Sequence, residues 1–248
     1  MLYKFKIKGI VCEIAFPKKD KKKGRVVIIL PGLPEYPRPK KIIENMARKG
    51  YYVIYPRYRG TFESEGEFLK ESPAKDIGDL ISSIKNGEEY EEIYGHKKFK
   101  IPVKKITIIA TSFGGSVALD LINLNIKIDK IILGSPVTDY KNHGNRGVEQ
   151  DLKNLKNFLL EGFSNLYRFN PSQFDKLIRG DIISFPAKTV GASFPIYLVH
   201  GKKDKTISFE KSEKFARDHS GIKFISLDNV GHLSLSKLQK LGILDKLL

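Results

Sequence analysis

The feature that most constrains the fold of this 248-residue chain is a series of short β-branched apolar runs separated by helical stretches. The first run is Val26 to Leu30, and later ones cover residues 52–55, 106–110, 131–133, 196–199 and 223–227. Continuous apolar runs of this length are typical of strands that helices cover on both faces. Helical patterns lie between them at residues 40–49, 73–86, 114–124, 209–218 and 235–247. This alternation predicts an α/β fold with a mostly parallel sheet and right-handed crossovers.

Two segments at the start of the chain have a different pattern. Residues 3–7 and 11–16 alternate apolar and charged side chains on either side of Gly9, which predicts two short antiparallel strands. With 248 residues, the chain falls within the size range of one large α/β domain. We therefore expect a single domain over residues 1–248.

Residues 139–190 interrupt the alternation, because they separate two predicted strands by far more than a usual crossover. Within them, Val148, Leu152, Leu155 and Leu159 recur at helical spacing. We interpret this insertion as a cap or lid over the carboxyl ends of the strands. The alternative is a second packing layer that has nothing to do with substrate.

Charge and cysteine content limit the classes of function. The net charge of +16 favours acidic partners, but the lysines are scattered along the chain, which favours a solvated basic surface over a nucleic-acid site. Cys12 is the only cysteine, so no intramolecular disulfide can form, and a reducing cytoplasm is expected. No apolar run reaches 18 residues, so no membrane span is expected. Residues 1–16 alternate apolar and charged side chains where a signal peptide would need an unbroken apolar stretch, so no signal peptide is expected. Two methionines and one cysteine beside many Lys and Glu hint at a thermophile.

One strand runs directly into a sharp turn that carries a serine. The apolar residues 106–110 are followed by Thr111-Ser112-Phe113-Gly114-Gly115 and then by a helical pattern. A serine at such a turn projects its hydroxyl out of the sheet, and it needs small residues two positions away on either side. Ala110 and Gly114 meet this need, although the usual pattern has glycine at both positions. Ser112 is therefore the candidate nucleophile, and the alternative is a serine that only caps the helix.

A serine hydroxyl needs an adjacent imidazole, which in turn needs a carboxylate to hold it in one tautomer. His232 is the candidate base, because it follows the last predicted strand and precedes the terminal helix. The other four histidines fit less well. His96 and His143 are expected in polar loops, and His219 is expected at a helix end. His200 ends a predicted strand and is interpreted as structural.

Asp204 is the candidate acid, because it lies in the loop directly beyond the strand at residues 196–199. The resulting order of serine, acid and histidine is the one expected when a strand–turn–helix serine is part of a triad. Asp139 and Asp228 are the competing acids, since each also follows a predicted strand.

Two backbone amides are candidates for stabilising a developing oxyanion. The Phe113 amide lies at the start of the helix after Ser112, where the helix dipole assists it. The second donor is expected in the loop that follows Leu30, where Leu33 has an amide to offer and Pro34 has none. The Tyr36 hydroxyl is the alternative second donor.

Together these residues resemble the α/β-hydrolase superfamily from Val26 to Leu248. Residues 59–68, Arg-Gly-Thr-Phe-Glu-Ser-Glu-Gly-Glu-Phe, are similar to a loop in the cocaine esterase and X-prolyl dipeptidyl peptidase group, and more distantly in prolyl-oligopeptidase-like hydrolases. The resemblance implies an α/β-hydrolase fold with Ser112 as nucleophile, Asp204 as acid and His232 as base. It also implies that Phe113 and Leu33 supply the oxyanion amides.

The expected activity is cleavage of an ester or thioester through an acyl-serine intermediate, in a monomer or homodimer. The expected substrate is a small ester or a short peptide, and no metal or organic cofactor is needed. One alternative is an aminopeptidase or acyl-peptide hydrolase, in which Glu35, Glu63 or Glu65 anchors a free amino terminus. The other is a binding or scaffold protein, since a fold does not guarantee an activity.

Overall fold

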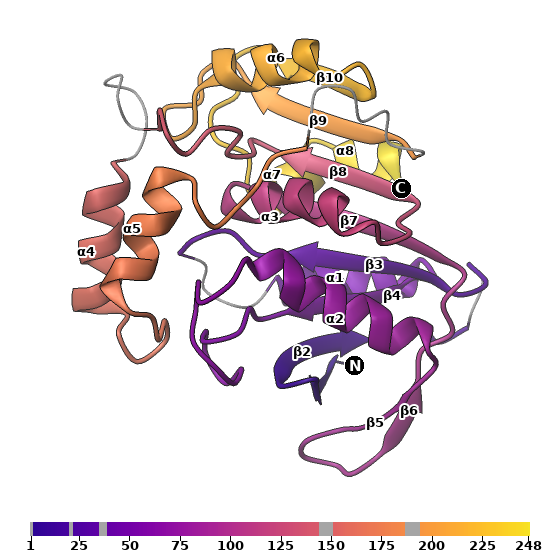
Figure 1. Cartoon of the computed structure of the whole chain (residues 1–248). Coiled ribbons are helices and arrows are strands. Elements are labelled where there is room, and N and C mark those ends of the chain that lie inside the picture. Colours follow the sequence, from indigo (N-terminus) through magenta and orange to yellow (C-terminus); the bar gives the residue numbers. More distant parts are fainter. Residues whose placement is uncertain (1, 20–21, 35–38, 144–150, 187–193) are drawn as a thin grey trace.

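The computed structural model describes residues 2–19, 22–34, 39–143, 151–186 and 194–248, and its centre is a twisted, mostly parallel sheet (Figure 1). The strand order in the sheet is β1-β2-β4-β3-β7-β8-β9-β10. The strands are β1 (Leu2–Ile7), β2 (Ile10–Ala15), β3 (Arg25–Leu30), β4 (Tyr52–Pro56), β7 (Lys105–Thr111), β8 (Lys130–Gly134), β9 (Ile196–Gly201) and β10 (Ile222–Leu227). The strands β1 and β2 pair antiparallel, as do β2 and β4, and the remaining pairs are parallel. The predicted fold class is therefore confirmed.

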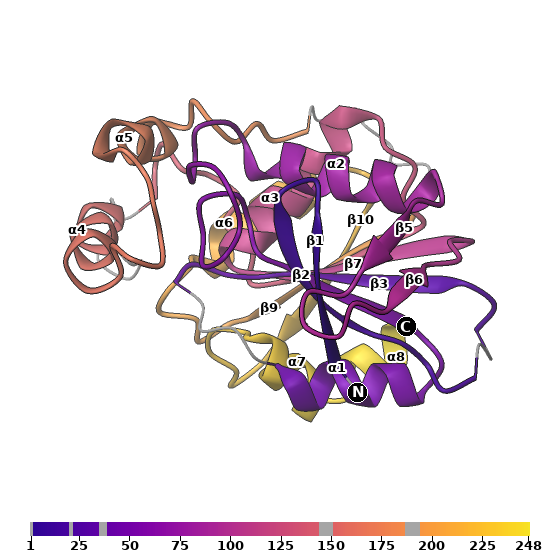
Figure 2. The same cartoon turned by 90° about the horizontal axis from the view of Figure 1, so that it is seen from below.

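Helices cover both faces of this sheet, as the continuous apolar runs predict. On one face lie α2 (Pro73–Lys85), α3 (Phe113–Leu121) and α6 (Phe209–Asp218), and on the other α1 (Lys40–Arg48), α7 (Leu235–Lys240) and α8 (Ile243–Leu247) (Figure 2). Serines begin several of them: Ser72 caps α2 before Pro73, and Ser208 caps α6. Each cap gives a side-chain acceptor to an amide that has no partner within the helix.

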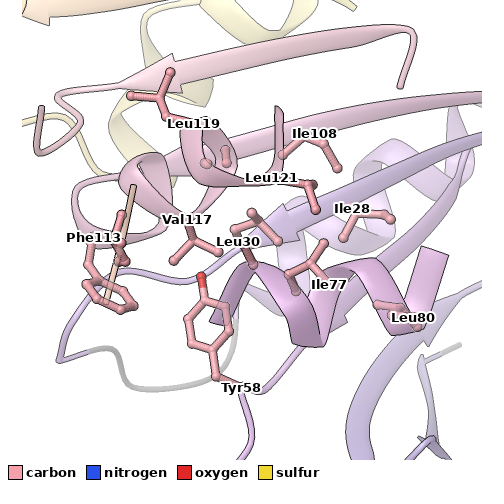
Figure 3. Close-up of a cluster of buried hydrophobic side chains, with 14 of the residues drawn as sticks. Ile28, Leu30, Tyr58, Ile77, Leu80, Ile108, Phe113, Val117, Leu119 and Leu121 are labelled. Carbon is pink, nitrogen blue, oxygen red and sulfur yellow. The ribbon is translucent and has the colours of Figure 1, made fainter. Parts of the chain in front are cut away.

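The two faces of the sheet bury separate apolar clusters. Figure 3 shows part of the first cluster, in which Ile28 of β3 and Ile108 of β7 lie near Ile77 of α2 and Leu121 of α3. The second cluster lies beneath α1, α7 and α8 and includes Ile43, Met46, Leu238 and Leu244. Because β3, β7 and β8 are buried on both sides, the residues at their carboxyl ends are held by a rigid core.

The segment between β8 and β9 contains two helices, α4 (Leu152–Gly162) and α5 (Pro171–Arg179). Figure 1 shows them on the side of the molecule toward which β3, β8 and β9 point. The spacing of Leu152, Leu155 and Leu159 predicted α4, and all three side chains are buried. Val148, which belongs to the same pattern, lies outside the described residues.

Three elements differ from the sequence-based expectations. The helix predicted over residues 235–247 is two helices, because Gly242 at φ 69° ends the first and begins the second. The sequence patterns also missed a hairpin of β5 (Glu89–Glu91) and β6 (Lys98–Lys100), whose three-residue strands are too short for a periodic signal. Helix α5 was missed as well, although Asn170 and Gln173 form a capping box before it and Gly180 ends it.

Among the described residues, no helix combines the length and the apolar character needed to cross a membrane.

Candidate active site

Ser112 lies at the junction between β7 and α3, where the predicted sharp turn is found. Its backbone has φ 53° and ψ −123°, a conformation that non-glycine residues rarely adopt. Although Ser112 is the residue before the helix, its side chain makes no capping hydrogen bond. The alternative in which this serine only caps α3 therefore has no support in the geometry.

The small residues beside Ser112 let α3 approach the end of β3. A β-carbon at Gly114 would lie 2.5 Å from the carbonyl oxygens of both Leu30 and Pro31, which is too close for any side chain. Gly115 is similarly close to Pro136. The loop after β3 and the turn at Ser112 are consequently in direct contact.

Asp204 and His232 meet at the carboxyl ends of β9 and β10. The Nδ1 atom of His232 lies 2.9 Å from Oδ2 of Asp204, within hydrogen-bonding distance. The Asp204 side chain is fully buried, whereas the His232 side chain is 27% exposed. This arrangement holds the proton of a neutral His232 on Nδ1 and leaves Nε2 as the basic nitrogen.

The Asp204 carboxylate has several further donors around it. Its Oδ1 accepts hydrogen bonds from the amides of Thr206 at 2.9 Å and Ile207 at 3.1 Å. The Nε2 atom of His200 lies 3.1 Å from Oδ2. Burial raises the pKa of Asp204, but the hydrogen bonds from His200 and His232 outweigh it and hold the pKa well below its usual range. Asp204 is therefore ionised at neutral pH.

The two competing acids have other partners. Asp139 accepts hydrogen bonds from the backbone and side chain of Asn142, at 3.2 and 2.7 Å. Asp228 forms a surface ion pair with Lys202, and its side chain is 79% exposed. Of the three candidate acids, Asp204 is the one that contacts His232.

The segments that carry Ser112 and His232 meet across the end of β8. A β-carbon at Gly134 would lie 3.2 Å from the side chain of Thr111 and 3.4 Å from that of Leu233. The Ser112 amide also donates to the carbonyl of Gly134, and the Leu233 amide donates to the Ser135 hydroxyl. Within the residues that the structure describes, no hydrogen bond joins the Ser112 hydroxyl to His232. Such catalytic hydrogen bonds often tighten only when substrate binds.

The amides of Phe113 and Leu33 lie on the two segments that touch at Gly114. Neither amide donates a hydrogen bond to another described residue. The loop that carries Leu33 is held by Tyr58, whose hydroxyl donates to the carbonyl of Pro31 at 3.1 Å. Tyr36, the alternative donor, lies outside the described residues, as does Glu35.

A small apolar pocket adjoins Ser112. It contains about 320 Å³ of space between atoms, counting space open to solvent, but only about 20 Å³ of it is open to the centre of a water-sized sphere. Leu33 and Phe113 line it beside the serine, and α4 and α5 contribute Leu152, Leu155, Phe174 and Leu177; the other lining residues are Val137, Tyr140, His143 and Ile207. The predicted insertion therefore supplies part of the wall of this pocket.

His143 and Tyr140 are pocket residues that the sequence patterns did not identify. His143 was expected to be a loop residue in polar surroundings, but it is buried and lines the apolar pocket. Tyr140 is buried with its hydroxyl 2.7 Å from that of Ser116, and burial raises the pKa of this phenol. Both follow β8 without a local motif, so only their position in space reveals them.

The segment from Arg59 to Phe68 orders neighbouring turns. The Arg59 guanidinium contacts Asp76 at 2.6 Å and Asp79 at 2.8 Å. The Ser64 hydroxyl accepts from the Val11 amide at 2.8 Å and donates to the Arg57 carbonyl at 2.7 Å. These contacts connect the loop to β2 and α2 rather than to Ser112.

No three His, Cys, Asp or Glu side chains among the described residues are grouped so that they could hold a metal ion.

The sequence matches no known family description and no curated protein. Solved structures with similar folds are nevertheless numerous. Est1E from Butyrivibrio proteoclasticus bound to ferulic acid is 16% identical with a TM-score of 0.67, over 98% of this chain and 96% of that one. An esterase from Exiguobacterium antarcticum is 17% identical with a TM-score of 0.63, over 100% and 99% of the two chains. The Pyrococcus furiosus esterase Pf2001 is 16% identical with a TM-score of 0.62, over 99% and 89%.

The sheet order, the two helical layers and these likenesses define the chain as a protein with the α/β-hydrolase fold. The finer resemblance to the cocaine esterase and X-prolyl peptidase group stays a prediction.

Proposed function

We propose that this protein is a serine hydrolase that cleaves an ester or thioester through an acyl-serine intermediate. The observation that carries the proposal is the 2.9 Å contact between His232 and the buried Asp204, at the same edge of the sheet as the strained Ser112 turn. The esterases of similar fold support the same class of substrate.

In the proposed reaction, the Ser112 hydroxyl attacks the carbonyl carbon of the ester and passes its proton to Nε2 of His232. The amides of Phe113 and Leu33 donate to the oxyanion of the tetrahedral intermediate. His232 then protonates the departing alcohol or thiol, which leaves an acyl group on Ser112. Water, deprotonated by His232, releases the acid and restores the serine. Asp204 stays ionised throughout and stabilises the imidazolium.

The pocket beside Ser112 is proposed as the acyl site, with residues 139–190 as the cap that closes it. Its walls are mainly aliphatic and aromatic, and the space in it that a water-sized sphere can reach is only about 20 Å³, so even a small acyl group must shift the side chains that line it. Short acyl chains are therefore the favoured substrates. A long chain would have to displace Phe174 or Leu177, which are buried on α5.

The test compares aryl esters from acetate to dodecanoate on the wild type and on Ser112→Ala. We expect the wild type to hydrolyse acetate and butyrate esters fastest and the variant to lose at least about 10⁴-fold in kcat. Labelling of Ser112 by a fluorophosphonate probe would separate an enzyme from a scaffold protein. Equal hydrolysis by both proteins would disprove the assignment.

Peptidase activity is the less favoured function, because two of the three candidate anchors for an amino terminus have other partners, while the third, Glu35, lies outside the described residues. Glu63 pairs with Arg57 and with Lys4, and Glu65 pairs with Lys6 at 3.0 Å. Both glutamates thus face β1 rather than the pocket at Ser112. Turnover of aminoacyl anilides without turnover of simple aryl esters would reverse this preference.

A further inference from the structure

His200 is a buried histidine with one ring nitrogen that has no partner among the described residues. It lies near the end of β9, its side chain is 0% exposed, and its ring packs edge-on against Phe209. Among the described residues and within hydrogen-bonding distance, nothing pairs with its Nδ1 atom. Buried polar atoms without a partner are uncommon, so this nitrogen calls for an explanation.

The opposite nitrogen faces two oxygen acceptors. Nε2 of His200 lies 3.1 Å from Oδ2 of Asp204 and 3.3 Å from the carbonyl oxygen of Ile207. The Ile207 carbonyl is placed to accept a hydrogen bond, and the carboxylate oxygen is nearer. A bare Nε2 would point its lone pair at two oxygens, so the proton must be on Nε2. Because a second proton on the buried Nδ1 would have no acceptor, we assign the neutral Nε2–H tautomer to His200.

The same carboxylate oxygen, Oδ2, is the acceptor for His232 at 2.9 Å. Asp204 therefore lies between two imidazoles: a buried one with a fixed proton and a partly exposed one that titrates during the reaction. The Ile207 carbonyl belongs to the same loop, whose amides at Thr206 and Ile207 bind Oδ1. His200 thus contacts both the carboxylate and the loop that carries it.

We propose that His200 is a positioning residue for the catalytic acid, which acts by sharing its Nε2 proton between Asp204 and Ile207. This inference rests on the proposed function. The fixed proton keeps the Asp204 carboxylate from rotating away from His232. Its hydrogen bond also offsets part of the negative charge of that carboxylate. Asp204 can then orient His232 without binding its proton so tightly that the base is blocked.

The test replaces His200 by Phe, which keeps the ring and removes the donor, and by Gln, whose amide can return an N–H near the position of Nε2. In His200→Phe, we expect kcat to fall about tenfold while KM stays nearly constant. The acidic limb of the kcat/KM profile should move to higher pH. Without the His200 donor, the Asp204 carboxylate keeps more of its negative charge and holds a proton on His232 more tightly. His200→Gln should restore most of the lost kcat and return the acidic limb close to its wild-type pH.

The charged and titratable groups near His232 set the background for this pH readout. Among the described residues, those with a side chain that contacts His232 are Asp204, with His200 behind it, and Lys237, whose Nζ atom lies 3.4 Å from the His232 carbonyl. Since Lys237 is unchanged in all variants, a moved limb reports on the contact between His200 and Asp204.

His219→Phe is the matched control, because His219 is also a buried histidine. Its ring nitrogens contact the carbonyls of Phe215 and Pro186 instead of a carboxylate. This control should lower the melting temperature without moving the pH profile. A folded His200→Phe protein with wild-type kcat and pH profile would overturn the proposal.

A second measurement depends neither on activity nor on the folding of a variant. In ¹⁵N-histidine-labelled wild type, NMR should show His200 as the Nε2–H tautomer at every pH between about 5 and 8. A doubly protonated His200, or the Nδ1–H tautomer, would contradict the inference even if esters are cleaved. Failure to cleave any ester, with the expected tautomer present, would instead count against the proposed function.

Discussion

At the scale of single residues, Asp204 shows how burial and hydrogen bonding act against each other. Removing a carboxylate from water raises its pKa, yet His200 and His232 lower the pKa of Asp204 by more than burial raises it. The amides of Thr206 and Ile207 further satisfy its second oxygen. An aspartate buried without such donors would be neutral and could not hold an imidazolium.

The depressed pKa of Asp204 predicts a pH-dependent contribution to stability. Because the pKa is lower in the folded state than the value of about 3.9 for an unfolded chain, the contribution is present above that pH and is lost as the pH falls further. In urea unfolding, the wild type should therefore exceed Asp204→Asn in free energy of unfolding at about pH 5, where the carboxylate is ionised in both the folded and the unfolded chain. The margin should shrink steadily below about pH 4. A margin that does not change with pH would contradict this account.

At the scale of elements, α5 connects the packing of the insertion to the substrate pocket. Phe174 and Leu177 are buried on the face of α5 that lines the pocket, and α4 contributes Leu152 and Leu155 to the same wall. The size of the acyl group that fits should depend on these side chains rather than on the rigid sheet.

Leu177→Ala should enlarge the pocket and change the preference for acyl length. We expect kcat/KM for octanoate esters to rise relative to acetate esters by about tenfold, since each buried CH₂ is worth about 0.8 kcal/mol. Like other large-to-small core substitutions, it should also cost about 2–5 kcal/mol of stability. Leu238→Ala is the control, because Leu238 is equally buried but belongs to α7, on the opposite face of the sheet. Leu238→Ala should lose stability without a change in acyl-length preference. The same change in preference in Leu177→Ala and Leu238→Ala would argue against the proposed acyl site.

At the scale of the whole molecule, the net charge of +16 produces a positive field around the protein. Such a field raises the encounter rate with anions and is screened by salt. Several surface lysines are paired, such as Lys4 with Glu63 and Lys202 with Asp228, but the 44 basic residues far outnumber the 28 acidic ones.

The charge predicts a difference between anionic and neutral esters of the same acyl length. For a hemisuccinate ester, kcat/KM should fall several-fold between about 0.01 M and 1 M NaCl, as the screening length drops from about 30 Å to about 3 Å. For a neutral butyrate ester it should change little. Stopped-assay initial rates over the salt series provide the measurement, and equal salt dependence for the two esters would exclude electrostatic steering.

Much of the architecture followed from the sequence alone, because its signals are local. The run at residues 106–110 predicted β7, the segment 209–218 predicted α6 to the residue, and the turn at Ser112 was predicted from the small residues around it. Periodicity and turn chemistry depend on neighbours along the chain, so no tertiary contact is needed to read them.

Other features were decided only by the tertiary structure, because they depend on residues far apart in the chain. The choice of Asp204 over Asp139 and Asp228 rests on its contact with His232, which lies 28 positions later. His143 became a pocket residue only when α4 and α5 packed beside it, and His200 gained a role only through its distance to a carboxylate. The order of residues therefore determined which chemistry was available, whereas burial and packing determined which side chains meet.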